Sequence, residues 1–344
     1  MSSRITLAIV VSLLAVAVRV HLFAQTRTAD AKANPSGTWL ERTSWGDPDF
    51  QGEWTSEGEF GVPFERPIQF GTRQFLTDEE YAARLETVKR REEHDLANVD
   101  VAGKVDDPNV PIPHWREYAT NSRRTSIVID PPDGRIPQRT PQAKPIPVQR
   151  CGSMQRGEPC DSYLDYNLHV RCIVQGEGIP DAMFPQVYNA NLRFTQSPGF
   201  VAITYELIHE TRVIPLDASP RPDPLLSPAI RMYKGASRGR WEGTTLVVET
   251  SNLKATTRSS SPALRLIERF TRTGKDSMEY EVTFIDPETW IKPWTAALTL
   301  QSRPDRAGVY EYECHEGNYG LRNMLSTSRH LDRQADQPES SPRP

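Results

Sequence analysis

The chain has 344 residues and a formal net charge of −4, with 41 Lys and Arg against 45 Asp and Glu. This mildly acidic balance argues against nucleic acid as a partner, because phosphate binding needs clustered Lys and Arg. The 29 prolines indicate loops with rigid connections and argue against a helical bundle.

Residues 1–24 have the pattern of a secretory signal peptide. Arg4 supplies the positive start, an apolar run extends from Ile5 to Val18, and Ala24 precedes the expected cleavage point. The run is shorter than the roughly 20 residues that span a bilayer, so we predict no transmembrane anchor. We expect a secreted or periplasmic protein whose mature chain keeps 39 basic and 45 acidic side chains, a net charge of −6.

The mature chain is expected to have three parts. An N-terminal extension covers residues 25–120, a β-rich domain covers 121–331, and a polar, disordered tail covers 332–344. Two Gly-x-Trp units in the extension end at Trp39 and Trp54. Such tryptophans plug the end of a β-barrel or cover a sheet, although ordinary loop packing explains them equally well.

Two helices are predicted. The first covers residues 77–96, because Thr77 and Glu80 match a capping box at its start. The second runs from Gly317 to about Leu331, where apolar residues recur at helical spacing.

Short β-rich runs joined by tight turns dominate the chain beyond Leu192. Apolar and polar residues alternate clearly in 264–270 and 280–284, so one face of each strand is apolar. Short connections force antiparallel pairing between neighbours. A meander of this length closes into a barrel or splits into a sandwich, and we favour the barrel because an open sheet exposes its edges. The predicted strands are 125–129, 192–196, 200–207, 211–215, 240–242, 245–250, 264–272, 277–285, 294–302 and 309–314.

The chain has four cysteines, which allow three full pairings in an oxidising compartment. Cys151 and Cys160 lie close together in a turn-rich stretch and are expected to bond to each other. That leaves Cys172 with Cys314, a bond across a long loop that stabilises by about 4–5 kcal/mol in the chain-entropy account. The alternative role of the cysteines is to bind a metal, but no Cys-x-x-Cys spacing supports it. We predict no metal and no cofactor.

Several motifs occur together along residues 45–328. They include Pro48-Asp49-Phe50-Gln51-Gly52-Glu53-Trp54, Tyr188-Asn189-Ala190-Asn191, Ser237-Arg238-Gly239-Arg240-Trp241-Glu242-Gly243 and Cys314-His315-Glu316-Gly317-Asn318-Tyr319. In this combination the chain resembles a large group of uncharacterised secreted bacterial proteins. The resemblance implies secretion and common ancestry and supplies no reaction. The chain departs from the pattern of the group at Glu210 and Thr244, where Asp is common, and in having Cys151 and Cys160.

A weaker, structural likeness is to the lipocalin or calycin barrels. These combine a Gly-x-Trp near the start, a meander of about eight strands and a helix after the last strand. The likeness implies a lipocalin-like up-and-down barrel with an N-terminal helical and loop extension and a C-terminal helix. A long stretch separates Trp54 from the main meander here, so strand-by-strand equivalence is not implied.

His209-Glu210 and His315-Glu316 each place an imidazole beside a carboxylate. Adjacent side chains on a strand point to opposite faces, so only one member of each pair faces a barrel interior. If both histidines face inward, they bind a metal with a further carboxylate, or one of them serves as a general base. No ligand-dense spacing supports the metal. The catalytic hypothesis is therefore His315 as base, with Glu316 or Tyr312 assisting, against a purely structural histidine.

A second group of residues is expected to contact a ligand. Amides and phenols offer a polar wall, arginines bind carboxylates bidentately, and aromatic rings stack on a flat ligand. Turn formation, cross-strand ion pairs and core packing are the structural explanations of the same residues. The predicted ligand-binding residues are Tyr188, Asn189, Asn191, His209, Arg212, Arg240, Trp294, Tyr312 and Asn318.

Three functions fit these patterns. The first is a secreted, disulfide-bonded barrel that binds a small organic ligand. The second is an enzyme on the same scaffold, acting by acid–base chemistry on a carbohydrate or similar small molecule. The third is an interaction module of the cell envelope. We favour ligand binding, because spacing alone reveals no set of nucleophile and base; the sequence indicates no oligomeric state.

Overall fold

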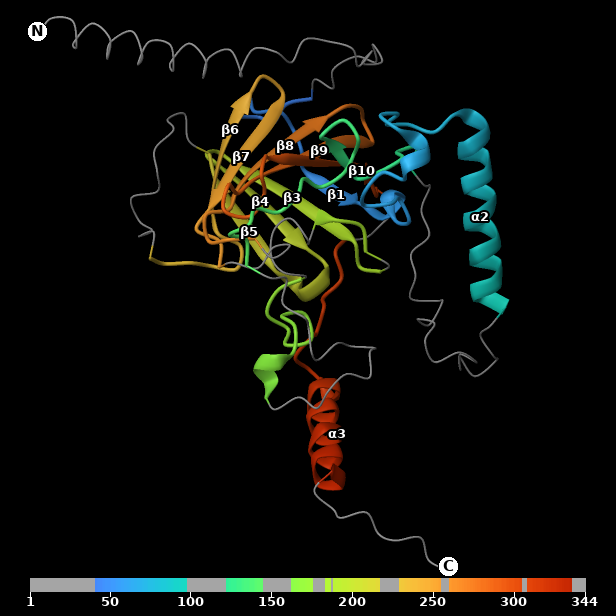
Figure 1. The fold of residues 1–344 in the computed structure, drawn as a ribbon. Coiled ribbons are helices and arrows are strands. Elements are labelled where there is room, and N and C mark those ends of the chain that lie inside the picture. The colour runs from blue at the N-terminus through green and yellow to red at the C-terminus, as the bar shows by residue number, and fades with distance from the viewer. Residues whose placement is uncertain are drawn as a thin grey trace, which may run out of the picture. The chain divides into compact units, whose positions relative to one another are not determined.

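The computed structural model describes residues 41–97, 122–144, 162–175, 183–186, 188–216, 229–254, 260–304 and 308–335. Within these ranges the chain forms ten β-strands in one sheet and two α-helices (Figure 1). The elements are β1 (Gly52–Thr55), α2 (Asp78–Ala97), β2 (Val128–Asp130), β3 (Asn191–Ser197), β4 (Phe200–Tyr205), β5 (Thr211–Pro215), β6 (Ala236–Glu242), β7 (Thr245–Ser251), β8 (Arg265–Arg272), β9 (Ser277–Ile285), β10 (Trp294–Ser302) and α3 (Tyr319–Ala335).

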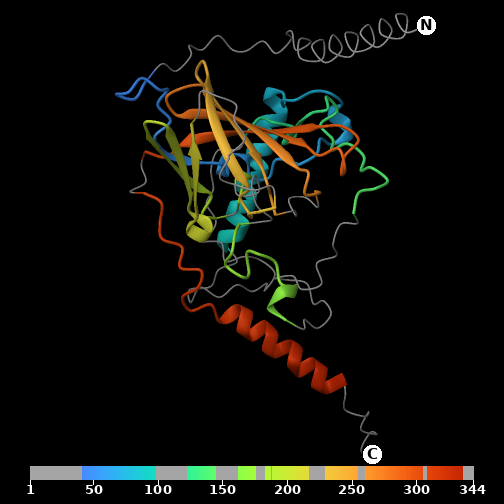
Figure 2. The same ribbon diagram turned by 90° about the vertical axis from the view of Figure 1, so that its left-hand side faces the viewer.

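Nine of the strands follow one another around a barrel in chain order (Figures 1 and 2). The sheet runs β5, β4, β3, β1, β10, β9, β8, β7, β6, so β5 and β6 are its two edges. These edges meet, because Leu216, directly after β5, forms a bridge with Gly239 of β6. The predicted mainly β fold, an antiparallel barrel with a C-terminal helix, is confirmed.

The junction between β5 and β6, which we call the seam, has to be parallel. All other neighbours in the ring are antiparallel, and nine strands cannot alternate in direction all the way round. The bridge between Leu216 and Gly239 is indeed parallel. Parallel neighbours need a longer connection than a hairpin. The proline-rich stretch from Pro215 to Ala236 supplies it.

The second Gly-x-Trp unit belongs to the barrel. β1 pairs with β3 on one side and β10 on the other, and Trp54 lies fully inside. The Trp54 indole N–H donates to the carbonyl of Phe50 at 3.0 Å, and the Phe50 N–H donates to Oε1 of Gln196 at 2.7 Å. Phe50 packs edge-on against Trp241 with ring centroids 5.2 Å apart, and the Arg272 guanidinium lies 5.1 Å from the centre of the Trp54 ring system. This segment therefore plugs one end of the barrel.

A short strand and a carboxylate cover the rest of the β10 edge, beyond β1. β2 pairs with the first residues of β10. Between β1 and β2, Oε1 of Glu59 accepts a hydrogen bond from the backbone N–H of Thr299 at 2.9 Å. Burial raises the pKa of Glu59, and the nearby Arg124 guanidinium partly opposes this effect. The carboxylate thus replaces a missing strand partner, and residues from the predicted extension complete the barrel wall.

Alternation within the strands produces one continuous core. In β9, Met278, Tyr280, Val282 and Phe284 point inward and are fully buried, while the residues between them are partly exposed. β8 alternates in the same way. Buried apolar side chains from eight of the nine ring strands join a single cluster, and Trp241 of the ninth, β6, packs against it. The patterns in 264–270 and 280–284 therefore predicted the inward faces correctly.

Both predicted helices are present, and one predicted strand is wrong. Thr77 and Glu80 form the capping box of α2, with the Thr77 N–H donating to Glu80 at 2.9 Å. Residues 309–314 have no β-pairing, because β9, β1 and β2 already occupy both edges of β10. No helix in the described ranges is both long and apolar enough to cross a bilayer.

Gly239 permits the close approach of β5 and β6, and we expect Gly239→Ala to destabilise the barrel. A Cβ at this position would lie 2.8 Å from Cδ2 of Leu216 and 3.0 Å from Cγ2 of Ile214. Overpacking of this kind costs about 1–3 kcal/mol, which urea unfolding can measure. The control is Gly320→Ala in α3, where the nearest atom is 3.5 Å away and a neutral or stabilising effect is expected. Equal effects of the two substitutions would contradict tight packing at the seam.

Candidate functional site

The two ends of the barrel carry different side chains. At the β3–β4 end, defined by the turn between Ser197 and Phe200, Phe50 and its partners fill the space. At the opposite end, the β4–β5 end, defined by the turn Glu206–Glu210, buried polar side chains gather near β3 to β6 and aromatic rings near β9 and β10. The β4–β5 end is the candidate functional site.

Glu206 is a fully buried carboxylate directly after β4. It accepts hydrogen bonds from Nδ2 of Asn189, at 3.1 Å, and from Nδ2 of Asn191. Its backbone N–H donates to the carbonyl of Asn191 at 3.0 Å. Two predicted ligand-binding asparagines are thus brought together around a carboxylate that sequence reasoning missed, because an isolated Glu at a strand end belongs to no pattern.

Lys234 lies at the same end of the barrel, just before β6. Its ammonium is 2.7 Å from Oε1 of Glu210 and 4.4 Å from the centre of the Tyr205 ring. Glu210 also accepts a hydrogen bond from the backbone N–H of Gln175 at 3.3 Å. Less than a fifth of either charged side chain is exposed, at 18% for Lys234 and 17% for Glu210. This ion pair is therefore screened by solvent less than a surface pair.

Left-handed backbone occurs in the same turn. Among the described non-glycine residues, five have positive φ; Ile208 (66°) and His209 (53°) lie in the turn, and Asn189 (51°) donates to Glu206. A left-handed residue costs on the order of 1–3 kcal/mol, and a β-branched residue such as Ile tolerates it least. Such conformations persist where surrounding contacts enforce them, and they are enriched in binding and catalytic sites.

Arg212 connects four strands inside the barrel. Its guanidinium donates bidentately to Glu268 of β8, at 2.9 and 2.5 Å, and also to Thr250 of β7 at 2.7 Å and Ser237 of β6 at 3.0 Å. The Tyr280 hydroxyl donates to the same carboxylate at 3.0 Å. Burial alone lowers the pKa of Arg212, but the Glu268 carboxylate raises it above its usual value. Arg212, predicted to bind a ligand carboxylate, binds a carboxylate of its own chain.

Aromatic rings form the other side of the β4–β5 end. Trp294, at the start of β10, stacks on Phe284 at 3.8 Å with nearly parallel planes. Trp290 and Phe64 meet Trp294 edge-on at 5.5 and 6.2 Å, and Phe184 meets Phe64 at 5.4 Å. Trp294 is fully buried, so the predicted ligand-stacking ring packs on other rings of the core.

The predicted disulfide between Cys172 and Cys314 is present, with the Cα atoms 5.6 Å apart and 142 residues between the two positions in sequence. It holds the segment that contains Tyr312 near the barrel end. Burial, together with the charge and hydrogen bond of Tyr188, raises the pKa of Tyr312 to about 12. Tyr188 and Tyr312 are therefore close together, and their predicted contact with a ligand stays a prediction. The predicted bond between Cys151 and Cys160 lies outside the described residues.

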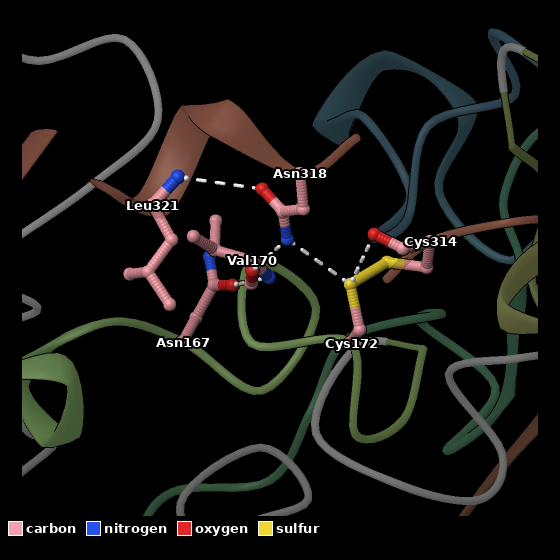
Figure 3. The surroundings of a disulfide bond; sticks show 6 residues. All are labelled: Asn167, Val170, Cys172, Cys314, Asn318 and Leu321. Carbon is pink, nitrogen blue, oxygen red and sulfur yellow. Dashed lines mark hydrogen bonds between the residues drawn. A yellow bond between two sulfur atoms is a disulfide. The ribbon is translucent and has the colours of Figure 1, made fainter. Parts of the chain in front are cut away.

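Asn318 links the disulfide to α3 (Figure 3). Its Nδ2 donates to Sγ of Cys172 at 3.3 Å and to the carbonyl of Val170 at 3.4 Å, while Oδ1 accepts from the N–H of Leu321 at 3.4 Å. The last contact caps the N-terminus of α3. Tyr166, in the loop beside the disulfide, packs against the apolar side of the helix. Asn318 thus has a structural role between the disulfide and the helix.

The remaining predicted residues lie on the surface. His315 and Glu316 follow the disulfide in an exposed turn, and no described side chain forms a hydrogen bond with the His315 imidazole. His209 is exposed in the 3-10 turn Leu207–His209, not on the inner face of a strand. Arg240 lies on the outer face of β6, in ion pairs with neighbouring glutamates.

The described residues contain no group of three or more His, Cys, Asp and Glu side chains that could hold a metal ion. Comparison of the chain with protein-family models, curated proteins and solved structures finds no match. The resemblance to the secreted bacterial group and to lipocalins stays a prediction. Arguments about function therefore rest on the geometry of the β4–β5 end.

We expect Arg212→Met to destabilise the protein by about 3–5 kcal/mol, because it leaves the Glu268 carboxylate buried without its counter-charge. The double variant Arg212→Met/Glu268→Leu should recover much of this loss, since it removes both charges from the core. Urea unfolding of the two variants measures the difference.

The matched control for this pair is Arg269→Met on the barrel surface. Arg269 pairs with Glu242 at 3.0 Å, and both side chains are about two-fifths exposed, at 39% and 41%. An exposed pair contributes about 0–1 kcal/mol. A loss at Arg212 no larger than that at Arg269 would show that the buried pair does not hold the barrel together.

The Tyr312 phenol should titrate near pH 12, well above the usual value of about 10. Because the pKa is raised in the folded state, the stability contributed by the neutral phenol is complete below about pH 10 and is lost as the pH rises to about 12. Absorbance at the phenolate band, compared between the protein and Tyr312→Phe, isolates this step. Tyr188→Phe should lower the pKa of Tyr312, and an unchanged titration would contradict the contact between the two rings.

Proposed function

We propose that this protein binds a small organic molecule at the β4–β5 end of its barrel. The observation that carries the proposal is the buried carboxylate of Glu206, held by the amides of Asn189 and Asn191. Burying a charge is costly unless it is compensated. The backbone ladders of β3, β4 and β5 are complete without this carboxylate. Polar side chains that converge in this way are typical of a small-molecule site.

The difference between the two ends supports this location. Phe50, Trp54 and Arg272 occupy the β3–β4 end with mutual contacts. The β4–β5 end instead combines hydrogen-bonding groups with buried aromatic rings, and small-molecule sites are lined by this mixture of groups. The left-handed turn at Ile208 and His209 adds backbone strain at the same place.

The chemistry of this end favours a neutral or zwitterionic ligand with hydrogen-bonding groups and an apolar face. Lys234 and Glu210 present opposite charges side by side, so the ion pair gives no net preference for an anion or a cation. The phenols of Tyr188 and Tyr312 both donate and accept hydrogen bonds. Sugars and aromatic acids or amines have matching groups.

We place the protein outside the cytoplasm. The secretory pattern of residues 1–24 and the disulfide between Cys172 and Cys314 both support a secreted or periplasmic location, because disulfides persist in oxidising compartments. N-terminal sequencing of the exported protein, with cleavage after Ala24, tests this part of the proposal.

The binding proposal is tested with the purified mature protein. Native mass spectrometry first checks for a retained ligand, and thermal-shift measurements then screen monosaccharides, aromatic acids and amines. We expect a hit whose affinity, by calorimetry, falls at least about tenfold in Asn191→Ala, the loss that follows from one buried hydrogen bond of about 1.4 kcal/mol or more. Arg240→Ala on the outer face is the control and should bind normally.

The same variants separate the alternative functions. If the ligand is turned over and His315→Gln abolishes turnover without changing affinity, the protein is an acid–base enzyme on this scaffold. Exposed positions such as His315 affect stability by at most about 0.5 kcal/mol, so lost turnover would not reflect unfolding. If neither a retained ligand nor a hit is found, the binding proposal is contradicted and an interaction module is the alternative.

A further inference from the structure

The seam is the one junction of the barrel that is held mainly by side chains. β6 pairs with β7 along its whole length, Ala236–Glu242, and β5 pairs with β4 along Thr211–Pro215. Between β5 and β6, the described residues have a single bridge, from Leu216 to Gly239. That bridge lies toward the β3–β4 end.

Two side-chain ties close the seam above this bridge. In the middle, Arg212 of β5 donates through Nε to Oγ of Ser237 on β6 at 3.0 Å, and its other nitrogens reach β7 and β8. At the β4–β5 end, Glu210 before β5 and Lys234 before β6 form an ion pair at 2.7 Å. Among the described residues, an ion pair, a buried arginine and one backbone bridge thus follow one another along the seam.

These side-chain contacts can break one at a time, whereas the hydrogen bonds of a backbone ladder break together. A ladder loses several coupled hydrogen bonds before its strands separate, so it usually opens with the whole fold. Side-chain ties can break while the strands keep their other partners, because β5 remains bonded to β4 and β6 to β7. The seam is thus the junction at which the barrel can open with the least loss of structure.

We propose that the seam opens locally, without unfolding of the remaining barrel, and that this opening is the route of a small molecule to the β4–β5 end. The second half rests on the proposed function; the first does not. Arg212 acts as the latch, since it is buried and binds three strands beyond the seam. Lys234 and Glu210 form the outer tie, which salt weakens more than the buried latch.

Thiol trapping of a buried position beside the seam tests local opening without any ligand. Ile214, on β5, is fully buried and points at Gly239 of β6. In Ile214→Cys, labelling by iodoacetamide should be at least about tenfold faster than global unfolding allows, and nearly independent of urea at low urea. The control is Val282→Cys, equally buried on β9 between paired neighbours, which should react only through global unfolding. The unsubstituted protein provides the blank.

The latch is tested by adding Arg212→Lys to each cysteine variant. Lysine keeps the charge but cannot make the forked contacts, so labelling of Ile214→Cys should accelerate beyond the change in global stability. Labelling of Val282→Cys should change only by that global amount. Equal opening free energies and equal urea dependence at the two cysteines would overturn the proposal, and so would an Arg212→Lys effect of the same size at both.

The two halves of the proposal fail in distinguishable ways. A saturating hit from the thermal-shift screen should slow labelling of Ile214→Cys if a ligand bound at the β4–β5 end holds the seam closed. Fast labelling that no bound hit alters would keep the local opening and reject the route. Binding that survives while Ile214→Cys reacts only by global unfolding would keep the proposed function and reject the seam.

Discussion

A ring of nine strands cannot alternate in direction at every junction, and this constraint shapes the molecule. One pair of neighbours has to run parallel, and the pair is β5 and β6. Parallel neighbours need a long connection, and here only one backbone bridge joins them in the described residues. Arg212 compensates from inside the barrel, because its fork joins Ser237, Thr250 and Glu268 on three successive strands.

Other polar groups lie close to this junction. Glu210 and Lys234 join across its end, Lys234 lies over the Tyr205 ring, and Glu206 follows Tyr205 in the chain. The ion pair of the seam, the left-handed turn and the buried carboxylate thus share the β4–β5 end of the barrel. The other end is filled by Phe50 and Trp54, brought there by the early strand β1. The barrel therefore has one end filled by apolar side chains and one end that combines polar side chains with aromatic rings.

Residues that precede the main meander form part of the barrel wall and also fill the β3–β4 end. β1, Glu59 and β2 occupy successive parts of the β10 edge, so no long stretch of that edge is left to solvent. The disulfide plays a comparable part for the C-terminal segment, since it brings Tyr312 beside Tyr188 and sets the start of α3 through Asn318. Segments far apart in sequence therefore meet around a few covalent or buried ionic contacts.

Local patterns in the sequence determined the inward faces of β8 and β9 and the capping box at Thr77, and the expected local bond between Cys151 and Cys160 left Cys172 for Cys314. Each depends on neighbours along the chain or on simple counting, so the sequence carries it directly. Tertiary structure alone decided that β1 belongs to the barrel, that residues 309–314 find no free strand edge, and that Arg212 meets Glu268. It also decided that Glu206 joins Asn189 and Asn191. These outcomes depend on which strand edges are free and which inward positions face each other, and periodicity along one strand encodes neither.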